Sequence, residues 1–143
     1  MITLQREKAE TPQIAAFTKK AWEVADLRHY GEKIDWTKEK CFIQAYDEGI
    51  LVGSLELDFM AGVMHILDVI VDPIQQQQGI GTLLMQSAET LAKEKSLHKI
   101  FLETGKTWDA CKFYEKLGYK KTGDLPNHYL QQDYVEYSKF LKE

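Results

Sequence analysis

The sequence predicts an α/β (α+β) fold built on one mixed β-sheet, and three observations predict it. The chain has 143 residues, the size of a single domain, which we place at residues 1–143. A strand pattern at 63–71 is followed by a helix pattern at 81–93 and a second strand pattern at 99–103. This order is typical of two parallel strands joined by a helix. Residues 41–46 and 50–59 flank a turn-like Asp47-Glu48-Gly49 segment and predict an antiparallel hairpin.

The N-terminal third contains one clear helix signal. Residues 2–8 alternate apolar and polar side chains and predict a first strand. Thr11 followed by Pro12 predicts a helix start, and apolar residues continue at helical spacing to Ala25. Residues 27–37 are rich in charge and aromatics and are compatible with either a short second helix or a loop.

The remaining elements follow from apolar patterns and turn residues. After the Ala61-Gly62 turn, residues 63–71 form a nearly continuous apolar strand, which is typical of a central strand covered on both faces. Residues 108–117 predict a further helix that ends at Gly118. Residues 119–122 and 133–141 predict the closing strands.

Composition argues against several classes of protein. Lys plus Arg number 18 against 22 for Asp plus Glu, and a net charge of -4 disfavours a nucleic-acid partner. No apolar run approaches the roughly 20 residues that cross a bilayer, and MITLQREKAE lacks the apolar region of a secretory signal. Cys41 and Cys111 have no zinc-site or disulfide spacing. We therefore expect a cytoplasmic protein with no membrane partner and no metal.

A polar loop, DPIQQQQGIG, joins the strand at 63–71 to the helix at 81–93. A helix N-terminus leaves four N–H groups unpaired, and Gly79 and Gly81 lack the Cβ atoms that would keep a ligand away. The loop therefore predicts a phosphate site, although the glycines could instead only permit a tight turn. Thr82 stands where a Walker A loop needs lysine, and Leu84 stands where a dinucleotide fingerprint needs its third glycine.

Two motifs give the chain a family resemblance. Val71-x-Pro73-x-x-Gln76-x-x-Gly79-x-Gly81 resembles the acetyl-coenzyme A signature of the GNAT superfamily of N-acetyltransferases, Arg/Gln-x-x-Gly-x-Gly/Ala. Residues 110–119, AxxFYEKLGY, resemble the second conserved block of that family. The resemblance covers nearly the whole chain. It implies a mixed sheet of about six to seven strands with about four helices, in which the central parallel pair splays around the cofactor.

The resemblance also implies an activity and a cofactor site. It implies transfer of an acetyl group from acetyl-coenzyme A to a primary amine by direct attack; the alternative is a non-catalytic domain that binds or senses acyl-coenzyme A. Thr107 departs from the family, which commonly has Asn there. The cofactor-binding residues implied are Val69, Ile70, Val71, Gln76, Gln77, Gln78, Gly79, Ile80, Gly81, Thr82, Thr107, Ala110 and Phe113.

The chemistry needs a proton acceptor and a proton donor. An amine with a pKa of about 10 must lose a proton before it attacks, and the candidate bases are His65, Asp68 and Glu56. In a regular strand the side chains of His65 and Asp68 point to opposite faces, so only one is well aimed unless a bulge intervenes, and Asp68 is slightly favoured. Tyr114 matches the general acid of the family, the alternative being a core tyrosine.

The acceptor is expected to be a small-molecule or peptide amine. We expect it to contact residues 27–37, the turn at Ala61-Gly62, and residues 125–133, which include His128 and Tyr129. A homodimer is possible, because dimers are common in the fold that the resemblance implies.

Overall fold

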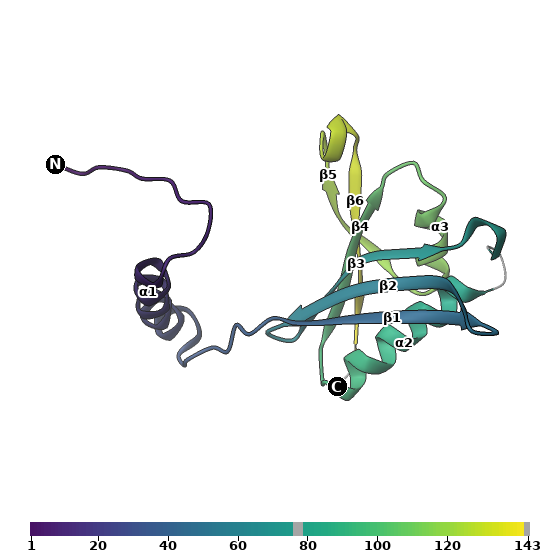
Figure 1. Ribbon diagram of the computed structural model, residues 1–143, viewed down its shortest axis with the longest axis horizontal. Helices are drawn as coiled ribbons and strands as arrows, with labels where there is room; N and C mark the ends of the chain where they lie inside the picture. The colour runs from purple at the N-terminus through teal and green to yellow at the C-terminus, as the bar shows by residue number, and fades with distance from the viewer. Residues whose placement is uncertain (76–78, 142–143) are drawn as a thin grey trace. The chain divides into compact units, whose positions relative to one another are not determined.

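A computed structural model describes residues 1–75 and 79–141, and the chain divides into two compact units, Met1–Trp36 and Thr37–Glu143. The first unit contains one helix, and the second contains a six-stranded sheet with two helices (Figure 1). Among the described residues, no helix is both long enough and apolar enough to cross a membrane.

Helix α1 (Pro12–Tyr30) starts where the sequence predicts. The Thr11 Oγ1 atom accepts a hydrogen bond from the Ile14 amide at 3.2 Å, and Pro12 occupies the first helical turn, where no N–H is needed. The helix ends at Gly31, whose left-handed φ of 79° lets its N–H donate to the Leu27 carbonyl at 3.0 Å.

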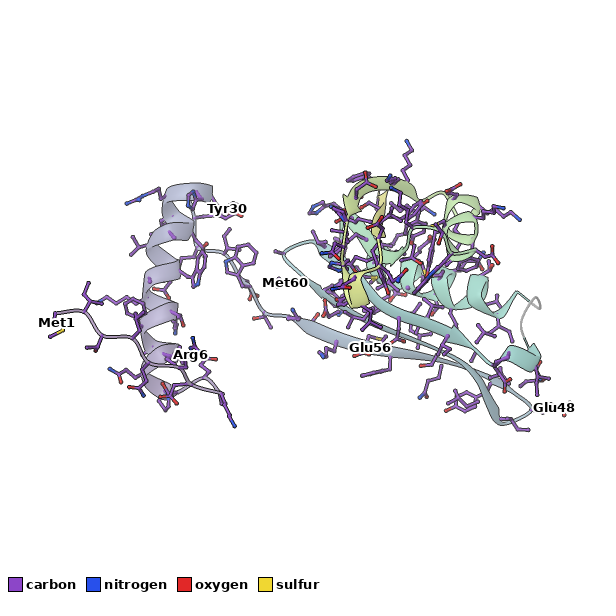
Figure 2. The ribbon with its side chains drawn as sticks, turned by 90° about the horizontal axis from the view of Figure 1, so that it is seen from above. Met1, Arg6, Tyr30, Glu48, Glu56 and Met60 are labelled. Carbon is purple, nitrogen blue, oxygen red and sulfur yellow. The ribbon has the colours of Figure 1, made fainter. Side chains whose placement is uncertain are left out.

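The segment after α1 is a loop rather than a second helix. Trp36 Nε1 donates to Asp26 Oδ2 at 2.9 Å, and Asp26 is only 4% exposed. The Trp36 ring also meets Tyr30 edge-on at 6.0 Å, and Figure 2 shows Tyr30 at the C-terminal end of the helix. Of the two alternatives for residues 27–37, the first part therefore continues α1 and the rest folds back on it as a loop.

The predicted first strand at residues 2–8 is wrong, because these residues have no regular secondary structure. Alternation shows which side chains could share a face, but a strand also needs a neighbour that pairs with its backbone groups. The pattern carries no information about that neighbour.

Replacing Thr11 with Ala is expected to destabilise α1 by about 1 kcal/mol, because the Ile14 amide loses its side-chain acceptor. Urea unfolding followed by circular dichroism at 222 nm measures the change. Thr18→Ala is the matched control, since the Thr18 hydroxyl bonds a carbonyl inside the helix and caps nothing. Equal midpoints for the two variants would contradict the capping role.

The sheet has the strand order β1-β2-β3-β4-β6-β5. Its strands are β1 (Glu39–Asp47), β2 (Ile50–Met60), β3 (Val63–Val71), β4 (Lys99–Gly105), β5 (Lys120–Leu125) and β6 (Tyr134–Phe140). The β3–β4 pair is parallel and the other neighbours are antiparallel, so the predicted mixed sheet is confirmed.

Two tight turns set the register of the first three strands. Glu48 and Gly49 both have positive φ, as do Ala61 and Gly62, which is the geometry of hairpins with two-residue turns. Figure 2 shows Glu48 at the tip of the first hairpin and Met60 at the other end of β2. The predicted hairpin around residues 47–49 is confirmed.

Helix α2 (Ile80–Glu94) and the short helix α3 (Ala110–Lys116) complete the second unit, with 3-10 turns at Pro73–Gln75 and Tyr129–Gln131. The described residues therefore hold three α-helices, against the four or so implied by the resemblance. The apolar side of α2 packs on the sheet. The fully enclosed core side chains are Leu55, Leu57, Met64, Met85, Ala88, Ala92 and Ile100.

Candidate functional site

The two parallel strands at the centre of the sheet separate partway along their length. Pairing covers Val63 to His65 on β3 and Lys99 to Phe101 on β4, but β3 continues to Val71 and β4 to Gly105. Figure 1 shows the two strands running apart after they meet. This is the splayed pair that the family resemblance implies, and the opening begins at His65.

A β-bulge interrupts β3 beside this opening. On the β2 side, Leu57 pairs with Ile66 whereas Glu56 pairs with Asp68, so Leu67 is an extra residue in β3. A bulge of this kind changes which face the following side chains occupy.

The bulge brings His65 and Asp68 to the same face of the sheet. Before it, Ile66 is buried in the core that α2 covers, and after it Val69 packs against that same core. His65 and Asp68 therefore both lie on the opposite face. The sequence separates the two side chains only if the strand is regular, and this bulge is the exception named above. Glu56 faces the same way, because it lies directly opposite Asp68.

The chain turns sharply between β3 and α2. The Asp72 amide donates to the Val52 carbonyl at 2.8 Å, and Asp72 Oδ1 accepts from the Ile74 amide at 2.9 Å, which fixes the turn. The predicted cofactor residues Gln76, Gln77 and Gln78 lie outside the described residues.

The N-terminus of α2 starts at Gly79, which has a left-handed φ of 78°. Among residues 1–75 and 79–141, no side chain accepts a hydrogen bond from the amides of the first turn of α2. A Cβ atom built at Gly79 would meet no atom of the described residues within 4 Å. Thr82 is half-buried in the same first turn.

Gly81 is where three predicted cofactor residues meet. A Cβ atom at Gly81 would lie 3.3 Å from the Phe113 ring of α3 and 3.9 Å from Val71 at the end of β3. The start of α2, the end of β3 and helix α3 therefore converge on this glycine, which lacks a side chain that would hold them apart.

Gly53 on β2 makes a second close approach that the sequence did not single out. A Cβ atom there would lie 2.9 Å from Ile80 Cγ2 and 3.2 Å from Leu84 Cδ1. The first turn of α2 therefore sits directly on the backbone of β2. A glycine in a strand interior is the signal that could have found this contact.

Tyr114 lies beside this convergence. Its ring meets Phe113 edge-on at 5.0 Å and Tyr119 at 6.0 Å, and its side chain is 9% exposed. Burial raises the pKa of Tyr114 to about 12, so its hydroxyl keeps its proton at neutral pH.

The Tyr114 hydroxyl is available to a ligand. Within residues 1–75 and 79–141 the hydroxyl has no hydrogen-bond partner. In the same residues, every side-chain nitrogen or oxygen that is fully buried does have a hydrogen-bond partner. The hydroxyl must therefore be partly exposed to solvent. The other two predicted residues nearby are Thr107, exposed in the turn after β4, and Ala110, which starts α3 and packs against the core.

His65 is held by two side chains of β4. Its Nε2 atom lies 2.7 Å from Glu103 Oε2, and its ring stacks on Phe101 with 4.3 Å between centroids and 8° between planes. His65 is predicted from the sequence, whereas Glu103, which lies 38 residues further along the chain, is not. Its place in a strand that the sequence predicts beside 63–71 is the only signal that could have found it.

The segment expected to contact an acceptor carries an aromatic cluster. Tyr134 meets Trp108, His128 and Tyr129 edge-on, with centroid distances of 5.3 to 5.4 Å. His128 and Tyr129 belong to residues 125–133, which are expected from the sequence to contact the acceptor. The cluster therefore ties this segment to the turn that follows β4.

Comparison with known proteins decides the family. The model of the Acetyltransferase (GNAT) family matches residues 7–119. The chain belongs to this family. The GNAT family uses acetyl-coenzyme A. Three features of the part of the chain that the structure describes fit that cofactor: the separated strand pair, the start of α2 without a side-chain cap, and the Tyr114 hydroxyl without a hydrogen-bond partner.

Three similar proteins are acetyltransferases by name. A glucosamine 6-phosphate N-acetyltransferase from Trypanosoma brucei brucei is 34% identical over 79 residues, which is 50% of this chain and 52% of that protein. The chain thus matches about half the length of this relative. An acetyltransferase from Bacillus cereus has a similar structure, with a TM-score of 0.73, 22% identity and coverage of 96% of this chain and 98% of that one.

The third similar protein is a structure that contains coenzyme A. The PaiA N-acetyltransferase of Thermoplasma acidophilum was solved in complex with coenzyme A; it has a TM-score of 0.65 and 18% identity, and the alignment covers 94% of this chain and 81% of that one. At these identities the two structures show that the fold is shared. The GNAT-like mixed fold expected from the sequence is therefore confirmed.

Proposed function

We propose that this chain is an N-acetyltransferase that moves the acetyl group of acetyl-coenzyme A to a primary amine of a small-molecule or peptide acceptor. Membership of the GNAT family supports the reaction class. The observation that carries the proposal is the opening between β3 and β4, with the α2 N-terminus and Tyr114 beside its far end.

Main-chain groups hold the cofactor in this proposal. The amides of Gly79, Ile80, Gly81 and Thr82 lie at the positive end of α2 and suit a pyrophosphate. Val69, Ile70 and Val71 lie in the part of β3 that has left β4, where an extended amide-containing arm can pair as a strand does. Phe113 closes the space above Gly81. The proposed roles of Thr107 and Ala110 are contacts with the same arm.

When bound, acetyl-coenzyme A supplies a thioester carbon that a neutral amine can attack directly. The protein then has to move protons. The Tyr114 hydroxyl, which keeps its proton at neutral pH as tyrosines do, would donate a proton to the leaving sulfur. The face that carries His65 and Asp68 supplies the acceptor for the proton of the amine.

The experiment is a test of thiol release from acetyl-coenzyme A with a panel of amines. The panel includes a polyamine, a lysine peptide, an aminoglycoside and glucosamine 6-phosphate, the last because a relative is named for it. The proposal is supported if thiol is released only when both the protein and one particular amine are present. Binding of coenzyme A by calorimetry with no thiol release from any amine would favour a sensing domain instead.

A further inference from the structure

We propose that Glu103 is a positioning residue that holds the His65 ring so that its Nδ1 atom takes the proton of the acceptor amine. The inference rests on the proposed acetyl transfer and deepens it, because it selects His65 as the base. It is carried by one hydrogen bond, one ring stack and the place of both in the sheet.

The hydrogen bond fixes which ring nitrogen is basic. His65 Nε2 and Glu103 Oε2 are 2.7 Å apart. A carboxylate oxygen only accepts hydrogen bonds, so Nε2 carries the hydrogen, and a neutral ring then has its lone pair on Nδ1. The bond to Glu103 is the one side-chain hydrogen bond of His65 within residues 1–75 and 79–141. Nδ1 is therefore left available to a substrate.

The ring stack fixes the plane of the imidazole. Phe101 lies nearly parallel to His65, with 4.3 Å between the ring centroids. His65 and Phe101 are also the last paired positions before β3 and β4 separate. The oriented ring thus lies at the start of the opening in which the thioester is proposed to lie.

Charged groups surround the pair on each neighbouring strand. Asp58 of β2 lies directly opposite His65 and is paired with Lys38 at 3.9 Å. On β4, Lys99 lies 5.5 Å from the Phe101 centroid. On β6, Glu136 lies directly opposite Glu103 and is paired with Lys99 at 4.0 Å. Asp68 lies further along β3. Of the charged side chains in the described residues, only that of Glu103 is hydrogen-bonded to the imidazole.

Asp68 is the rival base and lacks comparable support. It lies on the same face as His65, opposite Glu56, but its side chain has no hydrogen bond or ion pair with any residue of the described part of the chain. A carboxylate with nothing to orient it is a poorer fit to the requirement that a base be held within reach of one proton. His65, with an acceptor on one nitrogen and a stacked ring, meets that requirement.

The proton balance is simple. The acceptor arrives as an ammonium ion and gives one proton to His65 Nδ1. A C–N bond to the acetyl carbon then forms and the C–S bond breaks. The sulfur takes a proton from Tyr114, and the nitrogen gives its second proton back to the Tyr114 oxygen. His65 returns its proton to water, so one ammonium and one thioester yield one amide, one thiol and one proton.

The first measurement reads the tautomer of His65 in the cofactor-free chain. Long-range ¹H–¹⁵N spectra at a pH where the ring is neutral distinguish the Nε2–H from the Nδ1–H form, and His65→Gln identifies its signals among the four histidines. We expect the Nε2–H form in the native chain and a mixture in Glu103→Leu. Glu103→Gln keeps an oxygen that can accept, so it should retain the Nε2–H form.

The second measurement compares turnover in the same variants. Glu103→Leu should lower kcat at least tenfold, as expected for a base held in the wrong tautomer, with the KM for acetyl-coenzyme A little changed and Glu103→Gln less affected. Glu136→Leu is the matched control: it removes a carboxylate from β6, one strand further from His65, and should leave kcat near the native value. The Glu103 side chain is 28% exposed, and Glu103→Ala provides a second replacement if the leucine variant does not fold.

Three results would overturn the inference. An unchanged tautomer in Glu103→Leu is one, and a kcat loss no larger than that of Glu136→Leu is another. The third is a larger kcat loss in Asp68→Asn than in His65→Gln. A native chain that releases no thiol with any amine would instead remove the proposed function itself, before any variant is compared.

Discussion

Tyr114→Phe is expected to lower kcat by about 100-fold or more, while the affinity for acetyl-coenzyme A stays within about twofold. The hydroxyl is the group lost, and it has no partner among the described residues, so its removal costs no internal hydrogen bond. The ring contacts with Phe113 and Tyr119 remain. Steady-state thiol release gives kcat, and calorimetry gives the affinity.

The control for Tyr114 is Tyr119→Phe. Tyr119 is also buried, but its hydroxyl donates a hydrogen bond to Glu89 at 3.3 Å. This variant should be less stable and keep its kcat. Because burial raises the pKa of Tyr114 to about 12, ionisation of this tyrosine should cause no loss of activity between pH 6 and pH 9. Native turnover in Tyr114→Phe would leave Tyr114 as a core residue only.

Gly53→Val is expected to weaken coenzyme A binding by about tenfold or more, because overpacking costs about 1–3 kcal/mol and falls on the first turn of α2. The new Cβ would lie 2.9 Å from Ile80 Cγ2, so Ile80 and the amides beside it must move. Calorimetric titration with coenzyme A measures the loss. A lower melting temperature should accompany it.

A compensating substitution tests the cause. Ile80→Ala removes the Cγ2 atom that the new side chain would strike and keeps the main-chain amide. The Gly53→Val, Ile80→Ala double variant should bind coenzyme A more tightly than Gly53→Val alone, and Ile80→Ala alone should bind nearly as well as the native chain. If the double variant binds no better, the close approach is not what positions the helix.

Much of the second unit could be predicted from the sequence because its patterns are local. The strand predicted at 63–71 has the same bounds in the structure, since a short, nearly continuous apolar run between turn residues is typical of a buried strand. The strand predicted at residues 2–8 is wrong because strand formation depends on a partner that the alternation does not name.

The candidate site could be predicted where a sequence motif contains its residues, and it could not be predicted where it depends on packing between distant strands. The glycines at 79 and 81 and the block around Tyr114 are short and have fixed spacing. Gly53 and Glu103 reach the site from other strands, and their contacts appear only when the sheet is assembled. The extra residue in β3 is likewise invisible in the sequence, because Leu67 continues the apolar run.

The bulge at Leu67 also limits how roles transfer between relatives. In a homologue without that extra residue, the part of β3 before the bulge lies one position closer in sequence to the glycine signature. A residue found there by counting back the same number of positions therefore points to the opposite face of the sheet. An alignment with no gap at this point would then match His65 to a residue that faces the wrong way. Assigning a base in such homologues therefore needs a one-position offset upstream of the insertion, set by structure superposition.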